Sequence, residues 1–503
     1  MSTSLCSMIP ASPEQLRQLL ATHWWSALTL LLLPLFLWLL PLRQPSGRPP
    51  VVRSWIPWIG SYWAMRTDFD AFVARARRRH GDCFGVHSLG KTMYYITSPE
   101  IISSIYKSPK EFALSPMQFE WMRNIFGLSG AAAADAAAVG QQMFPLIHKA
   151  LSPAYVNGLG EAFAAAAASS LGALFEELHS RPGRTTVDLL PFVHSGVFDA
   201  ATHALFGPSF PSSSLQPSFS TFDASVPALA MGLSSSLDMP FTRAREDLLR
   251  VFEQYIAGQG LGEASELIEG VVQVARSHAW SGRDTAVWLL ALIWPLQANS
   301  PYAAYWLLVL MLRTPSGLRP LVEEIDAARG MWEKEHPAAR FEESVVDFIN
   351  EAPLPRLTSA IQETLRYATG SFSVRCVEAD SVCLGKHEFR KGDHLVCTVR
   401  SLHLSEDIFE DAHKFMPTRF IDRQYKQPSY LPFGGGISQC EGRFLALAQI
   451  RTFVVLLLST FDIALAEPQA PEVKFREGQR GFGMIRPKGD LKVVLATRNG
   501  FGI

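Results

Sequence analysis

The sequence predicts a mostly α-helical protein with a smaller β-rich part and one N-terminal transmembrane helix. Apolar residues recur at helical spacing over most of the chain from residue 100 to Arg366. From Tyr367 to Pro432, short β-branched runs, glycines and charged turns replace that pattern, as expected for strands. A third segment, near the N-terminus, is uncharged and long enough to cross a bilayer.

The bulk composition excludes several classes of protein. The chain has 503 residues, 48% of them hydrophobic, and a formal net charge of −1. This length is sufficient for a large core, and the balanced charge argues against nucleic acid as a partner, because such proteins usually carry a basic excess. The chain has 6 cysteines and no CxxC pair, which predicts reduced thiols and neither a disulfide scaffold nor a structural zinc site.

The N-terminal segment from Trp24 to Leu42 reads WWSALTLLLLPLFLWLLPL and carries no charge. A cleaved signal peptide is the alternative, but the preceding residues lack a basic start and no small-residue cleavage site follows. Arg43, Arg48 and Arg53 come next, so the positive-inside rule puts the body of the protein in the cytosol. We therefore expect an N-terminal tail over 1–23, a membrane anchor over 24–42, a proline-rich hinge over 43–58 and one domain over 59–503.

Four further segments have recognisable patterns. Gly81–Pro99 predicts a small hairpin, Gly207–Ser225 a Ser- and Pro-rich loop, and Phe444–Ser459 an apolar helix. The long apolar run Thr285–Leu312 fits either a second membrane span or a buried core helix. Polar residues and two prolines near its centre, at Pro295–Pro301, favour a buried helix that is locally unwound.

One cysteine lies in a glycine-rich loop, PFGGGISQCEGRFLALAQI, at Pro432–Ile450. Cys440 precedes an apolar helix, whose unpaired N–H groups and positive dipole end favour a thiolate. The glycines allow the backbone to approach a flat partner closely. A structural thiol, a nucleophile, and a metal or haem ligand remain open from these residues alone.

The residues Phe433-Gly-Gly-Gly-Ile-Ser-Gln-Cys440-Glu-Gly442 resemble the haem loop of the cytochrome P-450 superfamily. The resemblance implies the cytochrome P-450 fold and a haem (heme) cofactor whose iron is axially ligated by Cys440. It also implies that Phe433 packs on the proximal side of the ring, that Gly436 and Gly442 shape the loop around it, and that 59–503 is the catalytic domain. Ser438 departs from the family pattern, which has a basic residue there for a haem propionate.

Other motifs follow in the family's order. Glu363-Thr-Leu-Arg366 resembles the helical Glu-x-x-Arg motif, whose members share one helix face. Arg419, in Phe-Met-Pro-Thr-Arg-Phe, resembles the arginine that completes the family's buried ion pair. Together the three imply a structural support for the haem pocket. Arg375 resembles the arginine that the family places on a haem propionate, which a guanidinium binds bidentately.

On the distal side the family usually carries an acid followed by a threonine, whereas this chain has Gln297-Ala-Asn-Ser-Pro301. This variant is similar to the sterol 7α-hydroxylase and prostacyclin synthase branch. The resemblance implies catalytic roles for Asn299 and Ser300, although an amide cannot shuttle a proton as a carboxylic acid can. It implies a substrate pocket lined by Ala298, Phe482 and Met484.

The implied function is a membrane-anchored haem-thiolate monooxygenase that oxidises a lipophilic small molecule, such as a terpenoid, steroid or polyketide of secondary metabolism. Its expected partners are O2, an NADPH-dependent reductase and the membrane, without nucleic acid. The expected location is the endoplasmic reticulum membrane, single-pass, with the catalytic domain in the cytosol. Two alternatives remain: a haem-thiolate isomerase or dehydratase that needs no reductase, and a non-catalytic membrane scaffold.

Overall fold

A computed structural model describes residues 46–54, 59–180, 184–230, 240–258, 260–423, 425, 428–477 and 481–498. The predicted tail over 1–23 and the predicted anchor over 24–42 lie outside these residues, as does part of the predicted hinge over 43–58.

Helices make up most of the described chain. Their bounds are α2 Tyr62–Thr67, α3 Phe69–His80, α4 Pro99–Lys107, α5 Ser115–Trp121, α6 Gly130–Ala150, α7 Val156–His179, α8 Leu189–Phe206, α9 Ser212–Ala230, α10 Pro240–Ala257, α11 Glu266–Ser277, α12 Gly282–Gln297, α13 Ser300–Leu312, α14 Arg319–Glu335, α15 Val345–Glu351, α16 Pro355–Ala368, α17 Val399–His403, α18 Arg419–Asp422 and α19 Arg443–Thr460.

The strands are short. Their bounds are β1 Val51–Val52, β2 Cys83–Ser88, β3 Lys91–Ile96, β4 Phe112–Ala113, β5 Arg184–Asp188, β6 Phe372–Val377, β7 Ser381–Leu384, β8 His387–Arg390, β9 His394–Thr398, β10 Phe461–Leu465, β11 Lys474–Phe475, β12 Pro487–Lys488 and β13 Lys492–Thr497.

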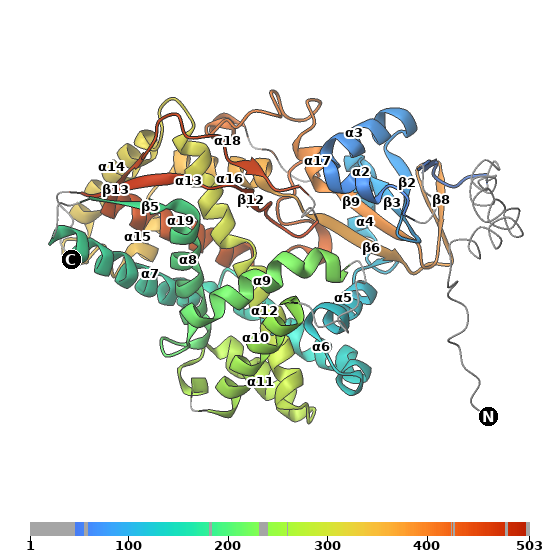
Figure 1. The fold of residues 1–503 in the computed structure, drawn as a ribbon, viewed down its shortest axis with the longest axis horizontal. Helices are drawn as coiled ribbons and strands as arrows, with labels where there is room; N and C mark the ends of the chain where they lie inside the picture. The colour runs from blue at the N-terminus through green and yellow to red at the C-terminus, as the bar shows by residue number, and fades with distance from the viewer. Residues whose placement is uncertain are drawn as a thin grey trace, which may run out of the picture.

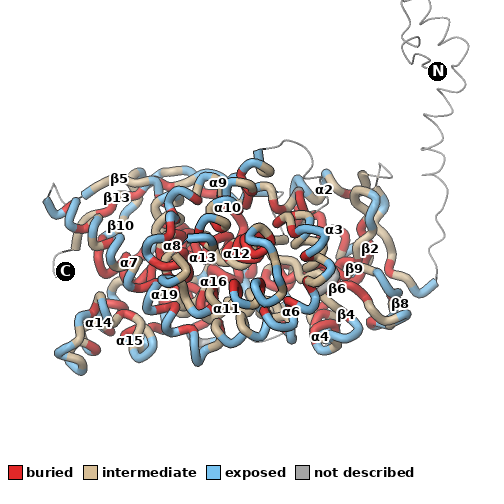
Figure 2. The backbone as a smooth tube through the Cα atoms, turned by 90° about the horizontal axis from the view of Figure 1, so that it is seen from below, coloured by how far each residue is buried: buried red, intermediate tan, exposed pale blue. Residues whose placement is uncertain are grey.

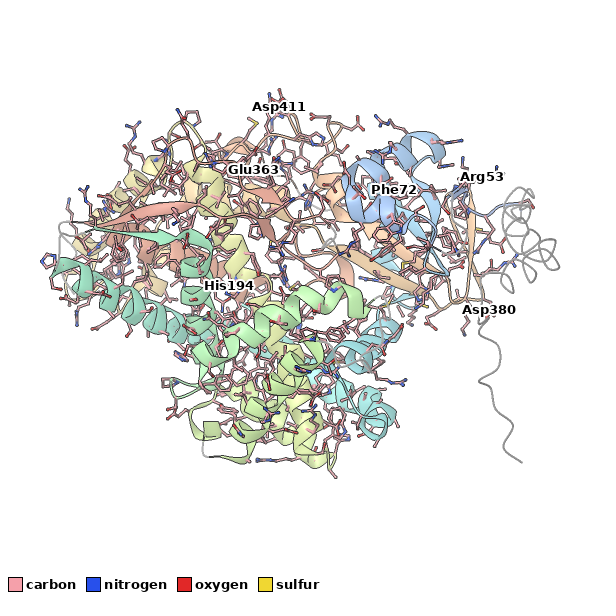
Figure 3. All side chains as sticks on the ribbon, viewed as in Figure 1. Arg53, Phe72, His194, Glu363, Asp380 and Asp411 are labelled. Atoms are coloured by element: carbon pink, nitrogen blue, oxygen red, sulfur yellow. The ribbon has the colours of Figure 1, made fainter. Side chains whose placement is uncertain are left out.

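The molecule has a sheet-rich end and a larger helical part (Figure 1). The main sheet has the strand order β1-β2-β3-β9-β6-β4, and β2 and β3 form the predicted antiparallel hairpin, which is confirmed. Figure 3 shows Phe72 of α3 beside this sheet and Glu363 of α16 in the helical part. A second sheet, β10-β13-β5, lies at the opposite end. The mostly α-helical class with a smaller β-rich part is therefore confirmed.

The core of the helical part contains the apolar run 285–312. It forms two helices, α12 and α13, with Asn299 between them in a non-helical conformation (φ −129°, ψ −59°). Pro301 has no N–H to donate to a preceding turn, which favours a break here. Most side chains of both helices are buried (Figure 2). The buried, locally unwound helix is thus the interpretation that the structure supports.

Two described helices, α7 and α19, are long and apolar enough to cross a membrane by length and composition alone. Two-thirds of the apolar window of α19 (67%) and 39% of that of α7 are buried inside the fold. Apolar helices of this kind also occur in the cores of soluble domains. The apolar helix predicted over Phe444–Ser459 corresponds to α19 and is confirmed.

The loop predicted over 207–225 is wrong from Ser212 onward, where α9 begins. Its serines and prolines suggested a loop, but Leu215, Phe219, Phe222 and Val226 recur every three or four residues and are at most 3% exposed. Burial of this apolar stripe stabilises the helix more than Ser and Pro propensities destabilise it.

Candidate functional site

A cavity of about 450 Å³ lies between the break in α12–α13 and the loop that precedes α19. Its walls are mainly apolar, and the cavity is bordered by Leu114, Trp121, Leu296, Leu365, Val399, Leu445 and Ile450 among others. Cys440, Asn299 and Ser300 all border it. The residues that the sequence marked as proximal and distal thus line a shared space.

Cys440 is held by its own backbone, because its N–H donates to the Phe433 carbonyl at 2.9 Å. Burial raises the pKa of the Cys440 thiol, while the Gly442 N–H and the Arg443 charge oppose the rise. The helix start alone therefore does not make this group a thiolate. A metal cation that binds the sulfur displaces its proton, so metal binding supplies the missing stabilisation.

The glycines of the loop have different roles. Gly436 has φ +67°, and a Cβ there would lie 2.5 Å from the carbonyl oxygen of Tyr106 in α4. Gly434 has nearly the same φ, +69°, but a Cβ there would meet nothing within 4 Å. Gly442 borders the cavity, and its Cβ would lie 4.0 Å from the Cys440 sulfur. Gly436 therefore lets the loop approach α4, whereas Gly442 keeps space beside the sulfur.

Arg375, from β6, brings a positive charge to the cavity wall. It is 4% exposed, donates to the Val374 carbonyl at 2.8 Å and lies over the Tyr106 ring. No carboxylate of the described residues forms an ion pair with it. A buried guanidinium normally needs an anionic partner. An anionic carboxylate on a bound cofactor fits this site, so the residues present fit a haem.

The distal break is fastened by an amide. Asn299 Nδ2 donates to the Pro295 carbonyl at 2.6 Å, and Asn299 Oδ1 accepts from the Met484 N–H at 2.9 Å. The Asn299 backbone N–H points instead to Leu296, at 3.4 Å. In a continuous helix the Asn299 backbone N–H would donate to the Pro295 carbonyl, and here the Asn299 side chain donates to that carbonyl instead. Ser300, by contrast, has a buried hydroxyl with no partner among the described residues.

The other predicted pocket residues lie in different places. Met484 borders the main cavity, and Phe482 borders a second cavity of about 210 Å³. Ala298 is fully buried and does not border either cavity, because it lies within the turn that ends α12. Sequence analysis missed Trp121, which borders both cavities and packs on Phe482. A tryptophan in a short helical segment carries no signal of its own.

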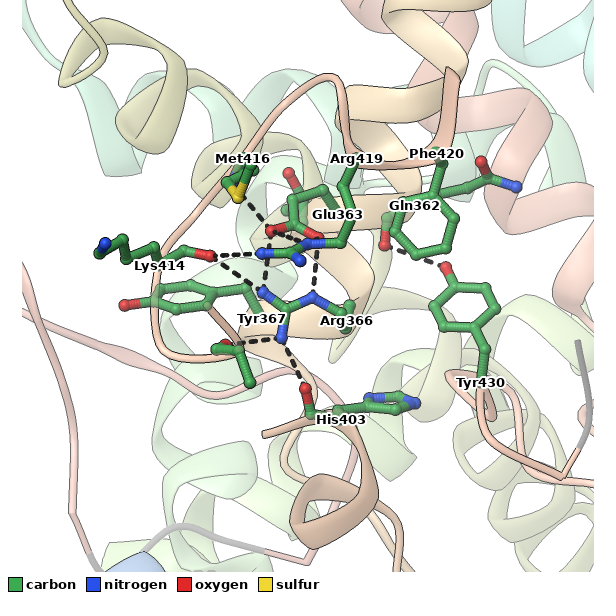
Figure 4. Close-up of polar contacts among 12 residues, drawn as sticks. Gln362, Glu363, Arg366, Tyr367, His403, Lys414, Met416, Arg419, Phe420 and Tyr430 are labelled. Atoms are coloured by element: carbon green, nitrogen blue, oxygen red, sulfur yellow. Dashed lines mark hydrogen bonds and ion pairs between the residues drawn. The ribbon is translucent and has the colours of Figure 1, made fainter. Parts of the chain in front are cut away.

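Glu363, Arg366 and Arg419 form a buried ion network (Figure 4). Arg366 binds both Glu363 oxygens, at 2.7 and 2.8 Å, and the Arg419 Nε lies 3.0 Å from Oε2. The remaining guanidinium N–H groups donate to backbone carbonyls at the end of α17 and in the chain between α17 and α18. These acceptors are His403, Glu410, Asp411, Ala412 and Lys414.

His403 connects this network to the cysteine loop. Its carbonyl accepts from Arg366 at 2.6 Å, and its ring Nε2 accepts from the Leu431 N–H at 2.9 Å. Leu431 lies two residues before Phe433, whose carbonyl accepts from the Cys440 N–H. The ion network thus fixes the backbone from which the loop departs. The five described cysteines are unpaired, and Cys440 alone among them borders the cavity.

Comparison with known proteins points to one family. The family model "Cytochrome P450", written cytochrome P-450 here, matches residues 49–259 and 299–493. Cholesterol 7-alpha-monooxygenase of Cricetulus griseus is 25% identical over 90% of this chain and 94% of its own length. Prostacyclin synthase of Rattus norvegicus is 26% identical over 91% and 95%, respectively. A 5-beta-cholestane-3-alpha,7-alpha-diol 12-alpha-hydroxylase of Sus scrofa is 24% identical over 92% and 95%.

The buried ring of His403 predicts acid sensitivity. Burial, with the Arg366 and Arg400 charges, lowers its pKa from 6.5 to about 3. The unfolded chain therefore binds this proton at higher pH than the folded chain. The contribution of neutral His403 to stability is complete above about pH 6.5 and is lost as the pH falls toward 3, by up to about 1.4 kcal/mol per pH unit.

We expect the denaturant concentration at the unfolding midpoint of the haem-loaded protein to decrease when the pH is lowered from 7 to 5. The midpoint of His403→Gln, which keeps an acceptor for Leu431 but does not titrate, should decrease less. Exposed His413→Gln is the control. If the midpoint depended equally weakly on pH in the His403→Gln and His413→Gln variants, the role of His403 would be contradicted.

The two glycines of equal φ allow a matched comparison. Both Gly434→Ala and Gly436→Ala carry the strain of a positive φ, about 1 kcal/mol or more, but only Gly436→Ala also meets the Tyr106 carbonyl. We expect Gly436→Ala to lose most bound haem on gel filtration while Gly434→Ala keeps most of it. The ratio of haem absorbance to protein absorbance measures this, and equal retention would show that the approach to α4 is unimportant.

Proposed function

Because the chain belongs to the cytochrome P-450 family, and is thus a haem-thiolate oxidoreductase of the monooxygenase type, we propose that it oxidises a lipophilic small molecule with O2 and electrons from an NADPH-dependent reductase. One observation carries the proposal: Cys440 and the polar pair Asn299–Ser300 border the same cavity, whose remaining walls are largely apolar. A cavity of this kind favours an apolar ligand that a few polar groups orient.

The proposed substrate is a rigid or elongated apolar molecule, such as a steroid, terpenoid or polyketide. The second cavity shares Trp121, Phe372 and Val374 with the first, so the two adjoin. Together they suit a molecule longer than the main cavity. Relatives named for cholesterol and cholestane substrates support a sterol-like shape.

The cofactor-binding residues have distinct proposed roles. The haem, when bound, supplies the activation of dioxygen. Cys440 provides the thiolate, Phe433 and Gly442 shape the space around the sulfur, and Arg375 binds a propionate with its unpaired guanidinium. Gly436 fixes the loop against α4, and Glu363, Arg366 and Arg419 hold the preceding backbone in place.

On the distal side, Ser300 and Asn299 divide the polar work. The Ser300 hydroxyl has no partner among the described residues, so it is available to bind a water that carries a proton into the cavity. Asn299 has one remaining amide N–H, because the other donates to Pro295. We assign proton handling to Ser300 and the orientation of an oxygen atom to Asn299, with Met484 and Phe482 as apolar walls.

We further propose a single-pass anchor over Trp24–Leu42 that holds the catalytic domain on the cytosolic face of the endoplasmic reticulum. Its support is the uncharged span followed by arginines. A lipophilic substrate dissolved in the bilayer would then lie close to the enzyme.

The thiolate is tested by spectroscopy. The reduced full-length protein with carbon monoxide should give the strongly red-shifted Soret band of a thiolate-ligated haem. Cys440→Ser should abolish that band because a hydroxyl does not replace the thiolate. Cys383→Ser, in the exposed β7–β8 hairpin, is the control and should keep the band. A red-shifted band that survives in Cys440→Ser would assign the ligand elsewhere, and a wild-type protein without haem would favour a non-catalytic scaffold.

A haem-thiolate isomerase or dehydratase is the second candidate, because residues 297–301 contain no carboxylate and prostacyclin synthase is among the relatives. The two functions differ in their need for electrons. We expect product from a sterol-like substrate only with O2, NADPH and reductase together. Product formed from an oxygenated substrate under anaerobic conditions without NADPH would replace the monooxygenase proposal with the isomerase.

A further inference from the structure

A second buried ion pair lies on the distal side of the cavity. Arg486 binds Asp223 through two hydrogen bonds, Nε to Oδ2 at 2.9 Å and Nη2 to Oδ1 at 2.6 Å. The side chains are only 5% and 11% exposed for Asp223 and Arg486, respectively. Burial lowers the pKa of Arg486, but Asp223 and Tyr302, through their charges and hydrogen bonds, together more than offset this and raise it. The guanidinium is thus charged although it is buried.

The pair joins three parts of the chain. Asp223 comes from α9, and it also accepts from Trp294 Nε1 of α12 at 3.0 Å. Arg486 follows the turn Gly481–Ile485 near the C-terminus, and its Nη1 donates to the Met484 carbonyl at 2.6 Å. His194 of α8 lies within reach of both charges of this ion pair, and burial lowers its pKa to about 4, so it is neutral. The Asp223 charge is therefore balanced by Arg486.

A chain of hydrogen bonds connects the Asp223–Arg486 pair to the break in the distal helix. The Met484 carbonyl binds Arg486, and the Met484 N–H binds Asn299, whose amide in turn binds Pro295. The approach is close, because a Cβ on Gly483 would lie 1.7 Å from Asn299 Oδ1. Each contact is a directional hydrogen bond, so a shift of the turn moves the groups that border the cavity.

The two segments that the ion pair connects also border the second cavity. Pro227 and Ala230, in the next turns of α9 after Asp223, line that cavity, and so does Phe482 of the C-terminal turn. An ion pair in an apolar setting specifies a geometry more reliably than it adds stability. Here the fixed geometry is the distance between α9 and the turn that carries Phe482 and Met484.

We propose that Asp223 and Arg486 are positioning residues that hold α9 and the C-terminal turn against the helix break, and thereby set which ligands fit above the haem. The proposal rests on the proposed function in one respect, namely that the two cavities receive the substrate. It assigns no contact between the pair and the reacting atoms.

The test compares two nitrogen ligands of haem iron on the haem-loaded full-length protein. Imidazole is too small to need the distal walls, whereas 4-phenylimidazole places a ring against them. Optical titration gives both dissociation constants. We expect Asp223→Asn to weaken 4-phenylimidazole about tenfold, as for the loss of a charge-assisted contact, and to leave imidazole unchanged. Arg486→Lys, which keeps the charge but not the fork, should act in the same direction.

A matched control removes an equally short ion pair elsewhere. Arg48 binds Asp393 at 2.6 and 2.8 Å, and neither residue borders the two cavities. Asp393→Asn should leave the ratio of the two dissociation constants unchanged. The double variant Asp223→Asn/Arg486→Lys should change the ratio no more than the worse single variant, because the two residues act as one unit.

Hydrogen exchange provides a readout that does not depend on ligand binding. Asp223→Asn should speed amide exchange in both 212–230 and 481–490, while Asp393→Asn should not. A ratio that does not change, or a parallel loss of both ligands, would overturn the proposal. A wild-type protein without haem would instead overturn the proposed function, and the exchange comparison would still decide whether the pair tethers the two segments.

Discussion

The two arginines that share the single carboxylate of Glu363 determine much of the proximal architecture. One carboxylate cannot neutralise two guanidinium groups. Their remaining N–H groups therefore donate to backbone carbonyls at the end of α17 and between α17 and α18. An irregular stretch has no ladder of its own to satisfy those carbonyls. The network therefore gives a defined shape to a segment that would otherwise lack one, and His403 transmits that shape to the loop of Cys440.

The distal side is also held in place by hydrogen bonds, but at a helix break. The apolar helix is interrupted at Asn299, whose side chain bonds to the Pro295 carbonyl and to the Met484 N–H of the C-terminal turn. An amide is suited to this because it both donates and accepts. A threonine, which the family more often has here, could not span from Pro295 to Met484 in the same way. The departure from the usual acid–threonine pair therefore also has a structural consequence, because Asn299 connects Pro295 to Met484.

Sequence analysis recovered what depends on local pattern. The β2–β3 hairpin, α19 and the break near Asn299 each follow from residues that are neighbours in the chain, and all three are present. Helix α9 was missed because Ser and Pro were given more weight than the spacing of Phe219 and Phe222. The Asp223–Arg486 pair could not have been predicted, since its members are 263 positions apart and no sequence pattern links the two. The motif predicted that Gly436 shapes the loop. It did not show why a glycine is required there, which is the close approach to the Tyr106 carbonyl of α4.

The buried arginines around the cavity differ in how their charge is balanced. Arg486 has a carboxylate of its own, whereas Arg366 and Arg419 share one and complete their bonding with carbonyls. Arg375 has no carboxylate among the described residues and donates to the Val374 carbonyl, and it borders the cavity directly. A buried cation without an anion is costly in a folded chain. The protein without its cofactor is therefore under electrostatic stress at this position, which the proposed propionate contact would relieve. Arg366, Arg419 and Arg486 each bind a carboxylate, so Arg375 is the arginine among these four without an anionic partner in the described residues.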